Sequence, residues 1–362
     1  MRSWVRTCGA LLYFVFPVMA MANAPVAETP LISERGAFDM ARWDYVINNI
    51  RTRALSNGIS GNVIKATLGT PAFIPSIVHS DKNQAEFKLT LDGYLTRTVS
   101  DSRVLNGQKM RKRYPTMLSR VEKQYGVSPH VILAFWGLES NYGDVKARHR
   151  LTDAFLTLIY EGRRETFFTN QLLALMKIAD KNKLSISDIH GSWAGAMGHF
   201  QFIPTTLAQY GVDGNNDKRI DIINSVGDAM FSAGNYLNKL GWNKNERIVR
   251  RVILPGNFDL SLLDGKTKLT LPQWSALGVT NPDGSPIPHN DMTAGLVADV
   301  AEIENIRAAR IAAAATMPMD ADIAPMPAIV AYLTYPNFYR IKKWNNSNWY
   351  AIAIAELADK LK

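Results

Sequence analysis

Apolar side chains recur every three or four residues along most of the chain, which is the spacing of one face of an α-helix. Helices are predicted over residues 38–50, 59–67, 86–99, 110–126, 128–143, 151–160, 167–179, 229–240 and 344–362. Short apolar runs at 248–254, 268–271 and 328–332 predict strands. Residues 291–327, with an alanine-rich middle, are predicted to form a flexible insertion with some helix. The pattern therefore predicts a mostly α (α+β) protein with a small β-containing part near its C-terminal end.

The segment 128–143, SPHVILAFWGLESNYG, combines an apolar helix with a single carboxylate. Ser128 suits the N-cap of this helix. Glu139 follows Trp136 by three residues, so a helix places the carboxylate on the apolar face. Burial and the negative end of the helix dipole should both raise the pKa of the Glu139 carboxyl, as a general acid near neutral pH requires. The alternative is an ordinary glutamate that reaches solvent at a helix end, with Gly143 as C-cap.

A glycine-rich stretch, GSWAGAMGHFQFIP at 191–204, is the second candidate for chemistry. Its glycines allow a ligand or another part of the backbone to come close. Ser192 and Gln201 supply hydrogen-bonding groups beside the rings of Trp193 and Phe200, a combination typical of sugar binding. A close-packed junction between a helix and a loop is the alternative interpretation.

Two adjacent arginines, Arg163 and Arg164, follow the predicted helix 151–160. A guanidinium group binds a carboxylate through two parallel hydrogen bonds, so the pair is a candidate clamp for substrate carboxylates. A solvated run of charges is the ordinary alternative.

Acidic and amide side chains alternate at Asp213, Asn215 and Asp217, and Asp228 follows them. Oxygen ligands at positions 1, 3 and 5 of a loop are typical of calcium sites. Lys218 stands at the sixth position, where a regular EF-hand has glycine, and the twelfth position is not glutamate. These two positions argue against a regular EF-hand, and a variant calcium loop and an Asx-rich turn both stay open.

The N-terminal residues 1–22 have the pattern of a secretory signal peptide, with two arginines, a short apolar run and a small-residue cleavage site. We therefore expect a periplasmic protein without disulfides, because Cys8 is the only cysteine. The formal charge of +9 falls to +7 when Arg2 and Arg6 are removed with this segment. A basic exported protein suits an anionic polymer, and the scattered lysines and arginines argue against nucleic acid.

Six motifs together resemble the membrane-bound lytic murein transglycosylase B family. They are WGLESNYG, RRETFF, GSWAGAMGHFQFIPTT, VDGNNDKRIDI, DAMFSAGNYLNKLGW and NFYRIKKWNNSNWYAIAI, in that order. The resemblance implies a lysozyme-like catalytic core with an additional helical N-terminal part and a small β-containing part. The expected division is a leader at 23–37, an N-terminal helical part at 38–112, the catalytic core at 113–245, and a final part at 246–362. That final part has an alanine-rich insertion near 300–327 and a C-terminal helix that closes the cleft.

The resemblance also implies a reaction. The family cuts the β-1,4 bond between N-acetylmuramic acid and N-acetylglucosamine in peptidoglycan without water, which leaves a 1,6-anhydromuramoyl end. Glu139 would be the single catalytic acid and base. No cofactor is required on this route, and a structural calcium ion at Asp213, Asn215, Asp217 and Asp228 is an added expectation.

Further residues follow from the resemblance position by position. Ser192 and Gln201 would bind the muramoyl sugar, and Arg163 and Arg164 would meet its acidic peptide or lactyl group. The cleft would be lined by Tyr236, Trp344 and Asn345. Two positions depart from the family pattern: Trp344 stands where tyrosine is usual, and His199 where glutamine is common.

Two other functions stay open on the sequence. A muramidase that uses water would need a second carboxylate near Glu139, and Asp144 and Asp153 are the nearest in sequence. A catalytically idle scaffold protein would bind peptidoglycan without cutting it. The expected partners are peptidoglycan glycan strands, together with cell-wall or secretion complexes that recruit a monomer.

Overall fold

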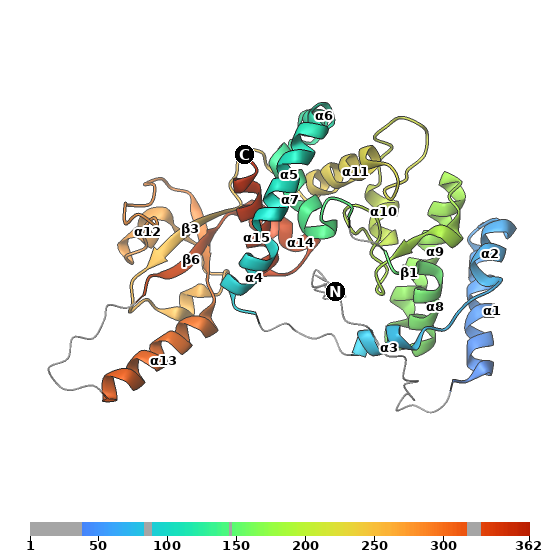
Figure 1. The fold of residues 1–362 in the computed structure, drawn as a ribbon, viewed down its shortest axis with the longest axis horizontal. Coiled ribbons are helices and arrows are strands. Elements are labelled where there is room, and N and C mark those ends of the chain that lie inside the picture. Colours follow the sequence, from blue (N-terminus) through green and yellow to red (C-terminus); the bar gives the residue numbers. More distant parts are fainter. Residues whose placement is uncertain (1–37, 83–88, 145–146, 317–326) are drawn as a thin grey trace, which may run out of the picture. The chain divides into compact units, whose positions relative to one another are not determined.

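The computed structural model describes residues 38–82, 89–144, 147–316 and 327–362 (Figure 1). The predicted signal peptide and leader lie outside these ranges, as does the end of the predicted alanine-rich insertion. No helix in the described ranges has both the length and the apolar character needed to cross a bilayer.

The chain divides into two compact units that do not follow one another in sequence. The helical unit contains residues 38–82, 101–144, 147–239 and 361–362, and the sheet unit contains residues 89–100, 240–316 and 327–360. The expected linear division at residues 112 and 245 thus differs from the compact units, because residues 89–100 belong with the C-terminal region.

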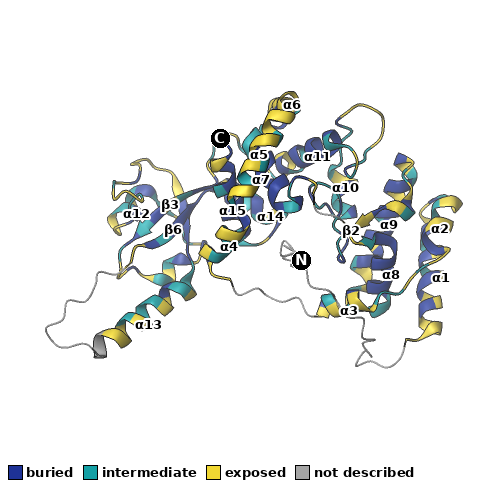
Figure 2. Ribbon diagram, in the orientation of Figure 1, coloured by how far each residue is buried: buried dark blue, intermediate teal, exposed yellow. Residues whose placement is uncertain are grey.

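The helical unit has a core of apolar helices. Its helices are α1 (Met40–Ser56), α2 (Gly61–Leu68), α3 (Pro75–Lys82), α5 (Asp101–Arg113), α6 (Pro115–Tyr125), α7 (Pro129–Ser140), α8 (Leu151–Glu161), α9 (Glu165–Asn182), α10 (Pro204–Tyr210) and α11 (Val226–Lys239). Strand β1 (His149–Arg150) pairs with β2 (His190–Gly191) in a two-stranded antiparallel sheet, with α8 and α9 between them in the chain. Figure 2 shows α8 almost wholly buried, whereas α6 keeps a long exposed face. The most apolar helices of the sequence, α7 and α8, therefore form the interior.

One local prediction in this unit is wrong, and another is confirmed in position but not in its hydrogen bond. The single helix predicted over 110–126 is broken between α5 and α6, because Pro115 lacks a backbone donor and disfavours the helical conformation at Tyr114. Ser128 occupies the N-cap position of α7, but its side chain makes no capping hydrogen bond. Its Oγ instead lies 3.0 Å from Nε2 of His130.

The sheet unit is built on a four-stranded antiparallel sheet with the order β3-β6-β5-β4. Figure 1 labels its neighbouring strands β3 and β6. Its strands are β3 (Val249–Leu254), β4 (Leu269–Thr270), β5 (Thr293–Val297) and β6 (Ile329–Thr334). Its helices are α4 (Leu91–Thr98), α12 (Leu271–Ala276), α13 (Val300–Thr316), α14 (Pro336–Trp344) and α15 (Asn348–Lys360). The strands predicted at 248–254, 268–271 and 328–332 are confirmed. At the start of α15, Ser347 Oγ accepts the backbone N–H of Tyr350.

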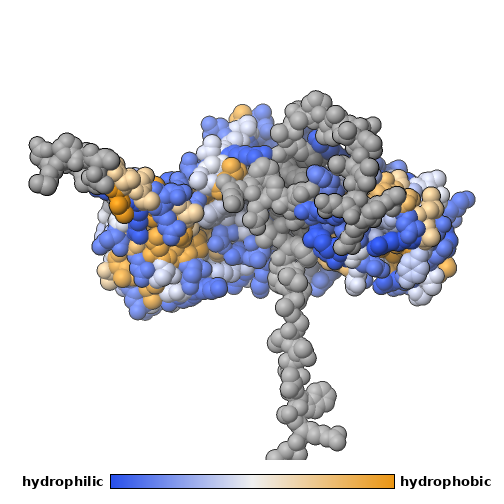
Figure 3. All heavy atoms as spheres, turned by 90° about the horizontal axis from the view of Figure 1, so that it is seen from below, coloured by the Kyte–Doolittle hydropathy of each residue, from blue (hydrophilic) through white to orange (hydrophobic). Residues whose placement is uncertain are grey.

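The prediction of a flexible insertion at 291–327 is wrong in its first part. Strand β5 pairs with both β4 and β6, and its residues from Ala294 to Val297 are buried. The indole N–H of Trp274 donates to the Ala294 carbonyl at 2.9 Å, which ties this strand to α12. The expected helix is present as α13, where Ile311 is 72% exposed. Figure 3 shows hydrophobic residues gathered on the face of this unit that carries α13.

Candidate active site

Glu139 lies in the last turn of α7, half-buried at the end of an otherwise buried run at 131–138. The three residues after the helix all have left-handed backbone conformations, with φ of 49° at Asn141, 64° at Tyr142 and 87° at Gly143. Such conformations are costly for side chains other than glycine and cluster at functional sites. The helix thus ends at Ser140, one residue after Glu139.

The glycine-rich loop is fastened to this last helical turn. The indole N–H of Trp136 donates to Nδ1 of His199 at 3.0 Å, and the Ser140 hydroxyl donates to the His199 carbonyl at 2.6 Å. The backbone N–H of Gly143 in turn donates to Ser140 Oγ at 2.9 Å. Ser140 is buried, so these bonds are sheltered from water. The loop that carries Ser192 and Gln201 is thereby held beside the turn that carries Glu139.

The glycines of this loop serve close packing against the protein itself. A Cβ on Gly195, whose φ is +96°, would lie 2.3 Å from the ring of Phe155. A Cβ on Gly198, with φ of +71°, would lie 2.5 Å from the Ile222 carbonyl oxygen. Real Cβ atoms essentially never come this close, so both positions require glycine. The close-packed junction that the sequence left open is the correct explanation for these two glycines.

The two predicted sugar-binding residues are oriented by local hydrogen bonds. Ser192 Oγ accepts the backbone N–H of Ala196 at 3.0 Å. Gln201 Nε2 donates to the Gly198 carbonyl at 2.8 Å, while its backbone has a left-handed φ of 49°. These bonds use the acceptor side of the Ser192 hydroxyl and the donor side of the Gln201 amide. Within the described residues, the hydroxyl proton of Ser192 and the Oε1 atom of Gln201 have no hydrogen-bond partner, so both can serve a ligand.

Tyr236 lies next to this loop. Its ring stacks on Tyr210 with centroids 4.5 Å apart and meets the ring of Phe202 at 5.8 Å. Phe202 directly follows Gln201, so the structure brings Tyr236 from α11 to the end of the glycine-rich loop. The side chain is half-buried, as a ring that lines a cleft would be.

The two arginines form ion pairs within the helical unit. Both Arg163 and Arg164 bind the carboxylate of Asp81, which is almost fully buried. The side chain of Arg164 is 8% exposed and lies over the ring of Phe168, whereas that of Arg163 is 48% exposed. Burial lowers the pKa of the Arg164 guanidinium, and the negative charge of Asp81 opposes this shift. Arg164 therefore has a structural contact, and only Arg163 is accessible enough to meet a solute; the substrate role of the pair stays a prediction.

The candidate calcium-binding residues of the acidic loop have two different surroundings. The side-chain oxygens of Asp213, Asn215 and Asp217 accept backbone N–H groups within the loop, so they face its interior. Lys218, with φ of +70°, adopts the turn that glycine provides at the sixth position of calcium loops. The first three residues thus fit a variant calcium loop in position and chemistry.

Asp228 fits a different role. It is completely buried, and its carboxylate accepts the backbone N–H groups of Gly214, Asn215 and Asp221 at 2.9, 3.3 and 2.9 Å. These three bonds make it the anchor of the loop. Among the described residues, no group of three or more acidic, histidine or cysteine side chains converges as a metal site.

Trp344 and Asn345 belong to the sheet unit, where α14 ends and α15 has not begun. Asn345 is buried and its backbone N–H donates to the Ile341 carbonyl at 3.0 Å. The structure therefore brings Glu139, Ser192, Gln201 and Tyr236 into one unit, and Trp344 with Asn345 into the other.

The carboxylates nearest to Glu139 in sequence differ in their surroundings. Asp153 is buried and receives two hydrogen bonds from Arg150, at 2.6 and 2.7 Å, and a third from the backbone of Ala72 at 3.1 Å. Asp144 is exposed in the turn after α7. Asp153 is thus committed to a structural ion pair, which argues against a role as second catalytic group.

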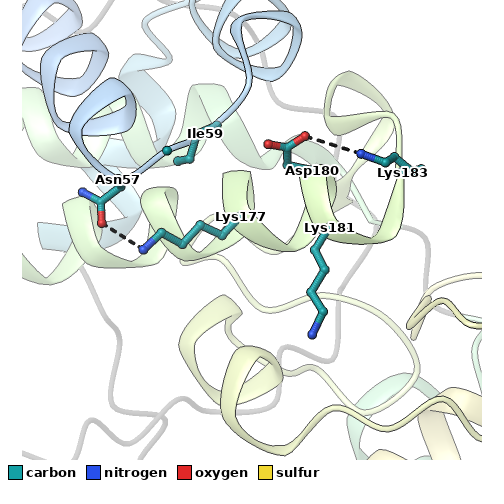
Figure 4. A pocket seen from close by; sticks show the side chains of 7 residues that line it. Asn57, Ile59, Lys177, Asp180, Lys181 and Lys183 are labelled. Carbon is teal, nitrogen blue, oxygen red and sulfur yellow. Dashed lines mark hydrogen bonds and ion pairs between the residues drawn. The ribbon is translucent and has the colours of Figure 1, made fainter.

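A surface depression of 310 Å³ lies elsewhere in the helical unit, between the α1–α2 turn and the end of α9 (Figure 4). Figure 4 shows Lys177 reaching Asn57 and Lys183 reaching Asp180, at 2.9 and 3.9 Å. None of the predicted site residues lines this depression.

Sequence reasoning missed the residues that join α7 to the loop. Ser140 has no predicted role in the sequence analysis, and His199 is named there only as a departure from the family pattern. The signal was present in the sequence, because a hydroxyl and an imidazole beside apolar runs need hydrogen-bond partners when they are buried. Which partners they find depends on the fold.

Comparison with known proteins shows which family the chain matches. The family described as "Transglycosylase SLT domain" matches residues 42–359. Membrane-bound lytic murein transglycosylase B of Escherichia coli (strain K12) is 28% identical over 266 residues, which cover 73% of this chain and 65% of that relative. The chain thus spans slightly less than two thirds of the length of this relative.

Solved structures with the same fold include two lytic transglycosylases. SltB3 from Pseudomonas aeruginosa, in complex with NAG-NAM-pentapeptide, has a TM-score of 0.77 and 33% identity, and the match covers 88% of this chain and 79% of that chain. Slt35 of Escherichia coli, in complex with bulgecin A, has a TM-score of 0.69 and 25% identity, and the match covers 88% and 92%. The expected lysozyme-like, mostly helical fold is confirmed. Because the family match spans most of its length, the chain belongs to the Transglycosylase SLT domain family.

Proposed function

We propose that this protein is a peptidoglycan lytic transglycosylase that cleaves the β-1,4 bond between N-acetylmuramic acid and N-acetylglucosamine. The observation that carries the proposal is the attachment of the Ser192–Gln201 loop to the helical turn that bears Glu139. A single half-buried carboxylate beside sugar-binding groups suits a reaction with one acid and base. The complexes of SltB3 with NAG-NAM-pentapeptide and with NAG-anhNAM-pentapeptide support the same class of substrate.

In the proposed reaction, Glu139 first donates its proton to the glycosidic oxygen, and the bond from this oxygen to C1 of the muramoyl sugar breaks. The 6-hydroxyl of the same sugar then attacks C1, and the Glu139 carboxylate takes the hydroxyl proton. One C–O bond breaks and one forms, the proton returns to Glu139, and no water is consumed. Ser192 and Gln201 hold the sugar during both steps, with the hydroxyl proton of one and the amide oxygen of the other.

No cofactor takes part in this chemistry. The loop of Asp213, Asn215 and Asp217 is proposed to hold a structural calcium ion, and the crystal structure of Slt35 in complex with calcium supports such a site in a relative. We further propose export by the segment 1–22 and a periplasmic location, which suits a substrate outside the inner membrane.

The test is product analysis by mass spectrometry after incubation with purified sacculi. Muropeptides with 1,6-anhydro ends are expected. Reducing muramic-acid ends would instead identify a muramidase that uses water, and binding without any released fragment would identify a scaffold protein. Sequencing the N-terminus of the protein recovered from the periplasm tests the export proposal, with a new terminus after residue 22 as the expected result.

A further inference from the structure

His199 makes hydrogen bonds to two separate segments of the helical unit. Its ring accepts from Trp136 and its carbonyl from Ser140, both in the second half of α7. Its own N–H donates to the Ile222 carbonyl at 3.3 Å, in the loop before α11. This one residue therefore links the helix of Glu139 to the loop on the other side of the glycine-rich stretch.

The space for the His199 ring is created by Gly143. A Cβ on Gly143 would lie 2.5 Å from Cε1 and from Nδ1 of the imidazole. The ring also meets Trp136 edge to face, with centroids 5.4 Å apart and an interplanar angle of 79°. The imidazole thus fills the gap between α7 and the left-handed turn that follows Glu139.

The hydrogen bond from Trp136 requires the neutral form of His199. An indole N–H can only donate, so Nδ1 must carry a lone pair, which an imidazolium lacks on both nitrogens. Trp136 is 1% exposed, and a buried donor without an acceptor is costly. Protonation of His199 would therefore break the contact and leave the indole N–H of Trp136 unsatisfied.

The surroundings favour the neutral ring. Burial lowers the pKa of His199, and the negative charge of Asp221 opposes this shift. The titratable groups closest in the chain to the residues that contact His199 are Glu139 in α7, Tyr142 and Asp144 in the turn after it, and Asp221 in the loop before α11. Burial raises the pKa of the Tyr142 hydroxyl, which stays neutral.

Glu139 stands between the two residues of α7 that His199 holds, three after Trp136 and one before Ser140. We propose that His199 is a positioning residue that holds the last turn of α7, and Glu139 with it, in the working arrangement, and that its protonation releases this hold. The inference rests on the proposed function, because it assigns a role toward the reaction of Glu139. Glutamine, common at this position in the family, could accept from Trp136 through Oε1 but could not titrate.

The test compares His199→Gln and His199→Leu with the wild type. Release of anhydromuropeptides is measured from pH 5 to 8, with kcat and KM determined separately. His199→Leu, which has no acceptor, should lose about 10- to 100-fold in kcat at all pH values with little change in KM, as expected for a misplaced catalytic group. His199→Gln should restore most of this kcat and should lack the decline in kcat that the wild type shows toward acid pH.

Trp136→Phe removes the donor of the same hydrogen bond, because phenylalanine has no N–H group. It should resemble His199→Leu, and the double variant should be no worse than either, since both remove one interaction. An acid decline that is the same in His199→Gln and wild type, or wild-type kcat in His199→Leu, would overturn the proposal.

A spectroscopic measurement separates failure of this inference from failure of the proposed function. The ¹H–¹⁵N signal of the Trp136 indole should shift on acidification in the wild type and not in His199→Gln. If the wild type releases no anhydro ends at any pH, the proposed function fails, and the positioning role fails with it even if this signal shifts. If the wild type releases anhydro ends and the chemical shift of the Trp136 indole does not change on acidification, only the proposed role of His199 is wrong.

Discussion

The guanidinium of Arg164 meets the carboxylate of Asp81 in the interior of the helical unit, where 8% and 1% of the two side chains are exposed. The pair joins the end of α3 to the start of α9 across 83 residues of sequence. Asp81→Asn removes the negative charge and leaves the buried arginine uncompensated. We expect a loss of about 3–5 kcal/mol in the free energy of unfolding, measured by urea denaturation.

Arg163→Gln is the control for this prediction. The Arg163 side chain also binds the Asp81 carboxylate but is 48% exposed, so water can replace the contact. A loss of at most about 1 kcal/mol is expected. If Arg163→Gln were as destabilising as Asp81→Asn, the exposed arginine would contribute as much as the buried one, contrary to this interpretation.

Glu139→Gln keeps the size of the side chain and removes the proton donor. We expect release of muropeptides to fall by at least about 10²- to 10⁴-fold, because no general acid remains for the glycosidic oxygen. Binding to sacculi, measured by sedimentation, should persist, since Ser192 and Gln201 are unchanged. Turnover equal to that of the wild type would remove Glu139 from the mechanism.

Gly195→Ala should destabilise the protein through two effects. The left-handed φ of +96° costs about 1–2 kcal/mol for a residue with a Cβ, and the contact with Phe155 adds about 1–3 kcal/mol of overpacking. Gly58→Ala is the matched control, because its φ is +72° and no atom lies within 4 Å of the added Cβ. Thermal unfolding of the two variants should therefore differ by the packing cost alone.

The acidic loop gives a prediction with two parts. Calcium should raise the melting temperature of the wild type, a chelator should reverse the effect, and the double variant Asp213→Asn/Asp217→Asn should abolish it. Asp228→Asn should lower stability by about 3 kcal/mol with or without calcium, since an NH2 donor replaces one of the two buried oxygens that accept the three N–H groups. An Asp228→Asn variant as stable as the wild type would argue against its role as anchor.

The lowered pKa of His199 gives a dependence of stability on pH. The folded ring binds its proton less tightly than the ring of an unfolded histidine, whose pKa is about 6.5. Between the two pKa values the unfolded chain therefore holds more protons, and the free energy of unfolding should decrease as the pH falls below about 6.5. Melting temperatures of wild type and His199→Gln should diverge over this range, with the variant less affected by acid.

Much of the fold follows from the sequence because its helices are strongly periodic. The segments that became α7 and α8 are apolar throughout and form the interior, as expected. Strand β5 was missed because its five residues, TAGLV, stand beside an alanine-rich helix, and only pairing with β4 and β6 makes them a strand. Pairing across distant segments is a property of the whole fold and has no local signature.

The candidate site shows the same limit. Glu139 could be singled out because a carboxylate on an apolar helix is unusual in any fold. The partners of Arg164 and His199 could not be predicted, because Asp81 and Trp136 lie 83 and 63 residues away in the chain. The chemical type of a residue can be read from the sequence, whereas the partners that orient its side chain are set by the fold.

The interleaving of the two compact units limits how this protein can be cut and recombined. A fragment that stops at residue 239 would retain α4 without α15, against which it packs, and would expose the buried Leu91. It would also lose Leu361, whose side chain covers Gly107 and whose carbonyl accepts from Arg111 at 2.8 Å. Cutting the chain at one point therefore does not give a fragment that contains all the packing contacts of either unit. Gene fusions or chimeras must carry both units together.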